Sequence, residues 1–118
     1  MAELRRRGIK IGLASSSVWE SVDRMLETTG ASDFIDHAIS GEDCSAYKPD
    51  PEVYQKALAA LGLNPDETIA VEDSPTGIAA AKNAGLRVYA LRQHYDPPMD
   101  QSAAEAVIER LSDILDYL

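Results

Sequence analysis

The order of apolar segments restricts the fold of this chain more than any other feature of its sequence. Short apolar runs of strand length, at residues 9–14, 34–40, 68–71 and 87–91, alternate with stretches in which apolar residues recur every three or four positions. Strands that alternate with helices are typical of a parallel sheet with crossover helices. The sequence therefore predicts an α/β fold with a single domain over residues 1–118.

Capping residues, prolines and glycines predict where the helices begin and end. Asp50-Pro51 and Ser74-Pro75 each place a capping residue before a proline, as at the start of a helix. Gly30, Gly62 and Gly85 are expected to follow the last turns of three helices. A last amphipathic helix is predicted from the apolar spacing of Val107, Ile108, Leu111, Ile114, Leu115 and Leu118.

Charge and composition exclude several classes of partner. The net charge of −9 would repel a nucleic-acid backbone, and no apolar run approaches the roughly 18 residues that a membrane-spanning helix needs. The N-terminus lacks the apolar stretch of a signal peptide, so a cytoplasmic location is expected. The single cysteine, Cys44, cannot form an internal disulfide and is interpreted as a structural thiol.

Polar residues follow three of the predicted strands, at the sheet edge where open parallel sheets bind ligands. Ser15-Ser16-Ser17 stands between a strand and a helix, where hydroxyl and backbone N–H groups can bind phosphate. Lys48 precedes the helix at Pro51 and could neutralise a phosphoryl oxygen. Glu72-Asp73 forms an acidic pair whose oxygens suit magnesium.

Each of these groups also has a simpler interpretation when it is taken alone. Ser17 could merely cap a helix, Lys48 could be a solvated surface lysine, and the acidic pair could belong to an ordinary loop. A hydroxyl, a lysine and an acidic pair at the ends of successive strand–helix units form a more specific pattern than any one of them. The order also argues against a phosphoacceptor receiver domain, which has its acidic pair first and its lysine last.

Three segments together resemble the second, third and fourth motifs of the haloacid dehalogenase superfamily. They are residues 8–17 (GIKIGLASSS), residues 48–54 (KPDPEVY) and residues 71–81 (VEDSPTGIAAA), of which the last is the most specific. The match looks most similar to the branch of β-phosphoglucomutase and phosphoglycolate phosphatase, and it covers nearly the whole chain. The resemblance implies a Rossmann-like three-layer parallel sheet.

The resemblance also implies site roles and a reaction class. Ser15 and the backbone N–H of Ser16 would contact the transferring phosphoryl group, and Lys48 would bridge it to the nucleophile. Asp73, together with Glu72, would hold Mg²⁺ directly or through water. Such proteins are magnesium-dependent phosphohydrolases or phosphomutases that act on small phosphorylated metabolites such as sugar phosphates. Positioning and charge neutralisation around the phosphoryl oxygens are what this reaction requires.

The family's first motif, Asp-x-Asp, has no counterpart in the sequence, and neither has the helical cap of this branch. That motif supplies the nucleophile, so this chain alone is expected to be an inactive C-terminal portion of the core. The absent first strand is central in the family's sheet order, 5-4-1-2-3. Strands on its two sides would then pair directly, capture a strand of another chain in a homodimer or strand-swapped assembly, or keep unpaired edges.

A second hypothesis is a short haloacid dehalogenase-like protein that binds phosphate or a partner without catalysis. An Asp-x-Asp encoded in frame upstream of Met1 would distinguish a fragment from this alternative. The residues that choose the substrate in the family lie in the cap and in the first loop, neither of which has a counterpart here.

Overall fold

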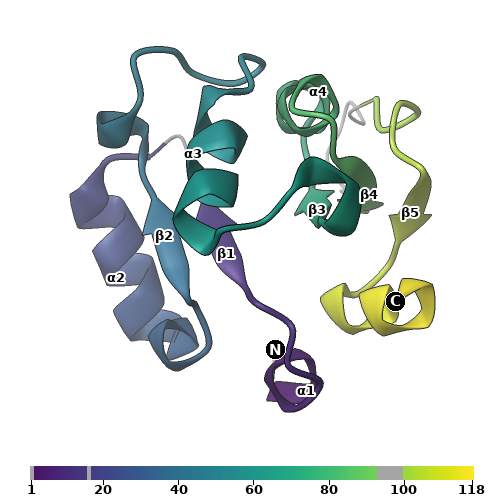
Figure 1. Ribbon diagram of the computed structural model, residues 1–118, viewed down its shortest axis with the longest axis horizontal. Helices are drawn as coiled ribbons and strands as arrows, with labels where there is room; N and C mark the ends of the chain where they lie inside the picture. Colours follow the sequence, from purple (N-terminus) through teal and green to yellow (C-terminus); the bar gives the residue numbers. More distant parts are fainter. Residues whose placement is uncertain (1, 16, 93–99) are drawn as a thin grey trace.

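The computed structural model describes residues 2–15, 17–92 and 100–118, which form an α/β arrangement of short parallel strands and helices (Figure 1). The first half contains α1 (Ala2–Arg6), β1 (Gly12–Ala14), α2 (Trp19–Thr29), β2 (His37–Ile39) and α3 (Glu52–Leu61). The second half contains β3 (Ile69–Glu72), α4 (Pro75–Asn83), β4 (Arg87–Leu91) and β5 (Ala106–Ile108). Four 3-10 helices complete it, namely η1 (Ala31–Asp33), η2 (Gly41–Asp43), η3 (Pro65–Glu67) and η4 (Leu111–Tyr117).

The strands form two separate parallel sheets. β1 pairs with β2, with Leu13 opposite Ala38, and β3, β4 and β5 form a three-stranded sheet in that order. Within the described residues β1 and β3 do not pair with each other, so of the three expected outcomes for these strands, direct pairing does not occur. Each of the two strands keeps one edge without a strand neighbour in the described part of the chain.

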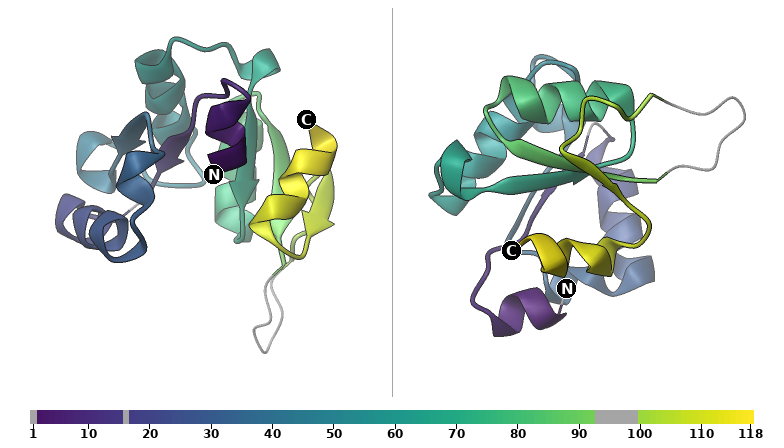
Figure 2. Two further views of the ribbon diagram at one scale, coloured as in Figure 1. Left: turned by 90° about the horizontal axis from the view of Figure 1, so that it is seen from below. Right: turned by 90° about the vertical axis from the view of Figure 1, so that its right-hand side faces the viewer.

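Helices cover both faces of the sheets, which gives the three layers that the sequence predicts. In the right-hand view of Figure 2, α3 and α4 lie on one side of the sheets, and α1 and η4 lie on the other. The main core lies where α3 and α4 pack on the strands, and it includes Val53, Leu58, Ile78 and Val88. A second cluster joins Tyr89, Ile108 and Ile114 on the side of η4.

The helix signals in the sequence are largely confirmed. Ser74 caps α4, where its hydroxyl accepts a hydrogen bond from the N–H of Gly77 over 3.1 Å and Pro75 is the first helical residue. Gly30 and Gly62 follow α2 and α3 in the left-handed conformation. The start of α3 lies one residue later than expected, with Pro51 at the cap position, although the Asp50 carboxylate still accepts a hydrogen bond from the N–H of Glu52.

The predicted first strand is too long. β1 begins at Gly12 rather than at Ile9. At Ile11, the residue before Gly12, the side chain of Asp36 replaces a neighbouring strand as the hydrogen-bond partner. Its carboxylate accepts a hydrogen bond from the N–H of Ile11 over 2.7 Å, and the N–H of Asp36 donates to the carbonyl of Ile11 over 2.7 Å. Parallel pairing with β2 therefore starts one residue after this contact.

The prediction of a last amphipathic helix is wrong. Residues Ala106–Ile108 form β5, which pairs with β4, and Leu111–Tyr117 forms a 3-10 helix instead of an α-helix. The β-branched pair Val107-Ile108 suits a strand, and pairing satisfies the backbone groups on the open edge of β4. Among the described residues, no helix has both the length and the apolar character that a membrane span requires.

Candidate phosphate site

Lys48 lies between the carboxyl ends of the two sheets. Its ammonium group donates a hydrogen bond to the carbonyl of Ala14, the last residue of β1, over 3.2 Å, and also pairs with the carboxylate of Glu72, the last residue of β3. The two side chains are only 14% and 9% exposed, so this ion pair is shielded from solvent. The lysine therefore connects the second and fourth sequence motifs at the carboxyl ends of their strands.

Tyr54 is a member of the site to which the sequence gave no role. It lies in the first turn of α3, is 9% exposed, and its hydroxyl donates to the same Glu72 oxygen that pairs with Lys48. The Lys48 ammonium also lies 5.3 Å from the centre of the Tyr54 ring. Burial and the negative charge of Glu72 raise the pKa of Tyr54 far above its ordinary value. The phenol therefore stays protonated and acts as a donor.

Gly77 lets α4 pass close to the Glu72 carboxylate. A Cβ atom added at Gly77 would collide with that carboxylate. Gly77 lies in the first turn of α4. Glycine has a low helix propensity, but only glycine leaves room here for the Glu72 carboxylate. The sequence signals for these two residues are a tyrosine within a predicted helix, whose hydroxyl needs a partner when it is buried, and a glycine inside the first turn of a helix. Neither signal tells which group the residue contacts.

Asp73 lies next to Glu72 but in a more exposed position. Both carboxylates line a hollow of about 250 Å³ with Val71, Leu91 and Leu111. The side-chain amide of Gln101 donates to the carbonyl oxygens of Asp73 and Leu91, over 2.9 and 2.7 Å, and so holds together the ends of β3 and β4. The backbone that carries the acidic pair is therefore held to the end of β4.

The acidic pair fits magnesium only in part. No group of three or more histidine, cysteine, aspartate or glutamate side chains in the described residues could hold a metal ion. Magnesium, however, is usually bound through one or two carboxylates, waters and substrate phosphate. Asp73 and Glu72 are the carboxylates that could take this role, and the Glu72 carboxylate also contacts Lys48 and Tyr54.

Ser15 follows β1 directly and so lies beside the carbonyl that accepts from Lys48. Its hydroxyl accepts a hydrogen bond from the N–H of Ser17 over 3.1 Å, and its own N–H donates to the carbonyl of Ile39 over 3.0 Å. Val18, not Ser17, is the cap residue of α2, and it makes no side-chain capping bond. The simple capping role for Ser17 is therefore not observed, and Ser16, the other predicted phosphate ligand, lies outside the described residues.

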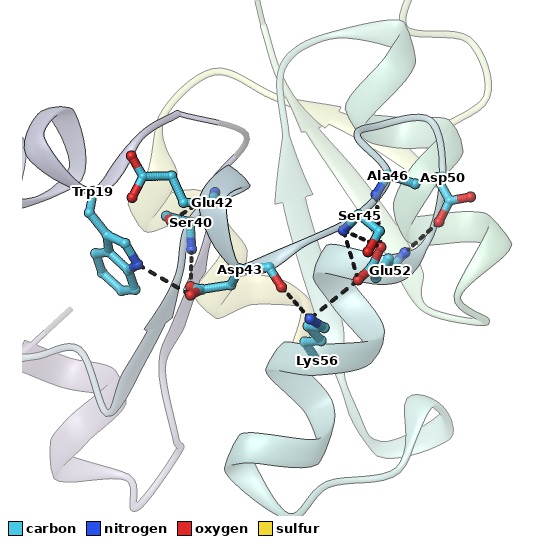
Figure 3. A network of polar contacts seen from close by, with 9 residues as sticks. All are labelled: Trp19, Ser40, Glu42, Asp43, Ser45, Ala46, Asp50, Glu52 and Lys56. Atoms are coloured by element: carbon cyan, nitrogen blue, oxygen red, sulfur yellow. Dashed lines mark hydrogen bonds and ion pairs between the residues drawn. The ribbon is translucent and has the colours of Figure 1, made fainter.

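A polar network holds the loop that carries Lys48 (Figure 3). The Glu52 carboxylate accepts hydrogen bonds from the N–H groups of Ser45 and Ala46, each over 2.9 Å, and pairs with Lys56 over 3.3 Å. Those backbone donors, followed by Lys56, hold the pKa of Glu52 below its ordinary value. Lys56 also donates to the carbonyl of Asp43, so the loop is anchored to α3 at both of its ends.

Residues 1–91 match the family model described as haloacid dehalogenase-like hydrolase. The chain belongs to this family. Among curated relatives of the haloacid dehalogenase-like hydrolases, it is 36% identical over 94 residues to validoxylamine A 7'-phosphate phosphatase of Streptomyces hygroscopicus subsp. limoneus, covering 80% of the chain and 44% of that protein. It is 31% identical to phosphoglycolate phosphatase of Rhodospirillum rubrum, covering 100% of the chain and 49% of that protein.

Solved structures of this haloacid dehalogenase-like family have the same fold. CbbY from Rhodobacter sphaeroides in complex with phosphate matches with a TM-score of 0.87 and 28% identity, over 96% of the chain and 52% of that protein. A putative β-phosphoglucomutase from Thermotoga maritima matches with a TM-score of 0.88 and 26% identity, over 99% of the chain and 56% of that protein. The chain thus spans about half the length of these relatives and corresponds to part of the family's Rossmann-like core.

Proposed function

We propose that this chain is the phosphate- and magnesium-binding portion of a phosphohydrolase or phosphomutase that acts on a small phosphorylated metabolite, such as a sugar phosphate. The observation that carries the proposal is the position of Lys48, which joins the end of β1 beside Ser15 to the end of β3 beside Asp73. The names of the relatives, phosphatases of small phosphorylated compounds among them, support the same reaction class.

The charged groups at the carboxyl ends of β1 and β3 suit a phosphoryl group only when a metal ion is added. Lys48 has three N–H donors and uses two of them for Ala14 and Glu72, which leaves one for a phosphoryl oxygen. The negative charge of Glu72 offsets the charge of the lysine. Mg²⁺ held by Asp73, with Glu72 through water, would supply the remaining neutralisation of the phosphate.

Catalysis by these 118 residues alone is not expected. The sequence contains no Asp-x-Asp, and the buried carboxylate of Glu72 is already paired with Lys48 and Tyr54. We therefore propose that the chain binds phosphate but does not transfer it.

Two assays on the 118-residue chain test this proposal. In the first, magnesium-dependent release of phosphate from p-nitrophenyl phosphate is compared between the chain and Lys48→Ala, and no difference is expected. In the second, inorganic phosphate is titrated in the presence of Mg²⁺ and followed by amide NMR shifts. Shifts at Ser15 and Asp73 are expected, and they should be lost in Lys48→Ala.

Lys10→Ala is the matched control for the titration. Lys10 is exposed and donates to the carbonyl of Leu61, at the opposite end of β1, so its removal should leave phosphate binding unchanged. An equal loss of phosphate binding in both variants would mean that binding depends on the net charge of the protein and not on this site. Release of phosphate that Lys48→Ala abolishes would show that a carboxylate of this chain does act as nucleophile.

A non-catalytic phosphate- or partner-binding protein is the second candidate. The shielded Lys48–Glu72 ion pair favours it, because this contact fills the site without any further group. The titration separates the two proposals when it is repeated without metal. Phosphate binding that requires Mg²⁺ would support the first proposal, that the chain is a portion of a magnesium-dependent enzyme. Equal binding without Mg²⁺ would support the second candidate.

A further inference from the structure

The side chain of Gln101 links the ends of two strands next to the acidic pair. Its Nε2 group donates one hydrogen bond to the carbonyl of Asp73 over 2.9 Å and another to the carbonyl of Leu91 over 2.7 Å. A carboxamide nitrogen carries two N–H donors, so these bonds use both of them. Gln101 is half-buried and lies outside the three motifs that resemble the family, so the sequence assigns it no role in the site.

The two carbonyls stand one position beyond the paired part of β3 and β4. The last pair in the register of these strands is Glu72 with Ala90, and Asp73 and Leu91 follow it on the two strands. At this point the chain leaves the sheet, because the next residue after Asp73 caps α4. Gln101 therefore supplies the donor that a longer strand would have received from its neighbour.

The segment that carries Gln101 is itself held in place. Lys82, in the last turn of α4, donates to the carbonyl of Ala103 over 3.0 Å, so the segment lies beside α4 (Figure 1). The N–H of Glu105 donates to the carbonyl of Val88 over 2.7 Å, directly before the segment joins the sheet as β5. Because the segment is anchored after Gln101 as well, this side chain can act as a fixed support for the end of β3.

The hydrogen bond from Gln101 restricts where the Asp73 carboxylate can point. The carbonyl carbon and the Cβ of a residue are bonded to the same Cα at nearly constant angles, so a fixed carbonyl limits the direction of the side chain. Asp73 is exposed, so close packing around its side chain does not set its direction. The backbone of Asp73 has this task, and Gln101 reaches that backbone from another part of the chain.

We propose that Gln101 is a positioning residue for the Asp73 carboxylate, and that the preference of the chain for Mg²⁺ over Ca²⁺ depends on it. The inference rests on the proposed function, in which Asp73 holds Mg²⁺. Magnesium demands a nearly octahedral arrangement of ligands at short distances, whereas calcium accepts irregular arrangements. A less well oriented carboxylate should therefore weaken the binding of Mg²⁺ more than the binding of Ca²⁺.

Separate titrations of the 118-residue chain with MgCl₂ and CaCl₂ test the inference. Gln101→Met removes both donors and keeps the length of the side chain. The NMR shift of the Asp73 amide gives a dissociation constant for each ion in the unchanged chain and in the variant. Loss of a group that orients a metal ligand typically costs about tenfold or more in affinity. We expect Gln101→Met to weaken Mg²⁺ binding by about tenfold and Ca²⁺ binding by about threefold or less.

Lys82→Met is the matched control. It removes a donor that holds the same segment, at Ala103, but it leaves the bonds of Gln101 to both strand ends in place. The ratio of the two dissociation constants should stay within about twofold of the unchanged chain. This variant also removes a positive charge, which favours both cations and so cannot imitate a selective loss of Mg²⁺.

A second measurement needs no variant and keeps the test valid where Gln101→Met does not fold. In the unchanged chain, the Nε2 protons of Gln101 should shift during the Mg²⁺ titration with the same dissociation constant as the Asp73 amide. This result is expected because the Gln101 side chain bonds directly to the residue that receives the ion.

Equal Mg²⁺ affinity in Gln101→Met and in the unchanged chain, with binding at Asp73 in both, would overturn the inference and leave the proposed function standing. Absence of any Mg²⁺ shift at Asp73 in the unchanged chain would overturn both. Equal weakening of Mg²⁺ and Ca²⁺, or the same selective loss in Lys82→Met, would also overturn the inference, because Gln101 would then only support the fold. Nε2 protons that do not respond to Mg²⁺ while Asp73 does would have the same meaning.

Discussion

Lys48 donates to acceptors in two different sheets, so a single side chain connects parts of the molecule that share no strand pairing in the described residues. Its partner Glu72 receives a second hydrogen bond, from Tyr54. The shielded carboxylate of Glu72 thus accepts hydrogen bonds from two donors. Removal of either donor leaves its negative charge with fewer partners where water cannot easily replace them. The stability of the site thus depends on Tyr54 as well as on the lysine.

We expect Tyr54→Phe to lower the free energy of unfolding by about 1.5–3 kcal/mol, the range for a lost hydrogen bond to a charged group. Tyr47→Phe is the matched control, because Tyr47 is 62% exposed and its hydroxyl should contribute less than about 0.5 kcal/mol. Urea denaturation of both variants checks the difference. Equal stabilities would mean that the Tyr54 hydroxyl does not support Glu72.

The sequence could identify site residues that are polar and follow strands, but not those that act through packing. Ser15, Lys48 and Asp73 stand in motifs whose order alone suggests a phosphate site. Tyr54 lies on the apolar face of a predicted helix, so periodicity counts it as core. The pairing of Glu72 with Lys48 depends on how β1 and β3 are placed relative to each other, which no local pattern contains.

The loop of residues 44–50, which precedes α3, is held in place by the first turn of that helix. Glu52 binds the backbone of Ser45 and Ala46, three and two residues before Lys48, and Lys56 one turn later pairs with the same carboxylate. The helix thus sets the position of the lysine through a carboxylate that must be charged. A neutral side chain at position 52 would accept these hydrogen bonds less strongly.

We expect Glu52→Gln to speed amide exchange at Ser45 and Ala46 relative to the unchanged chain at neutral pH. The pKa of Glu52 is lowered in the folded state, so its contribution is present above its ordinary value of 4.5 and is lost as the pH falls through the lowered pKa. In acid, the exchange rates of Ser45 and Ala46 should therefore become equal in Glu52→Gln and in the unchanged chain. Glu27→Gln, on the exposed part of α2, should leave both amides unchanged at every pH.

At the scale of elements, local signals predicted capped helix starts better than they predicted the limits of strands. The α4 start depends on Ser74 and Pro75, which act within one turn and are visible in the sequence. The limits of β1 depend on Asp36, a side chain that reaches it from another part of the chain. β5 was missed for a similar reason, because the open edge of β4 and not the spacing of apolar residues decides the conformation there.

The molecule as a whole has an uneven distribution of backbone pairing. β4 is paired on both edges and contains the buried residues Val88, Tyr89 and Ala90, whereas β1 is a strand of three residues paired on one edge. Amide protection follows pairing and burial. The three-stranded sheet should therefore be the most stable part of the fold and the two-stranded sheet the least.

We expect native-state hydrogen exchange to rank β4 slowest and β1 fastest among the strands. β3 should exchange at intermediate rates, because within the described residues only one of its edges is paired with another strand. The measurement follows the amides of all strands at several low concentrations of denaturant. A single common rate for β1 and β4 would show instead that the two sheets open together as one unit.

The separation of the two sheets also makes the fold sensitive to pressure. It leaves a cavity of about 650 Å³ that is lined by residues of β1 and β3. Voids inside a fold disappear when the chain unfolds, so the unfolded state has the smaller volume and high pressure favours it. The chain should therefore unfold at a lower pressure than a protein of the same length in which the sheet is continuous.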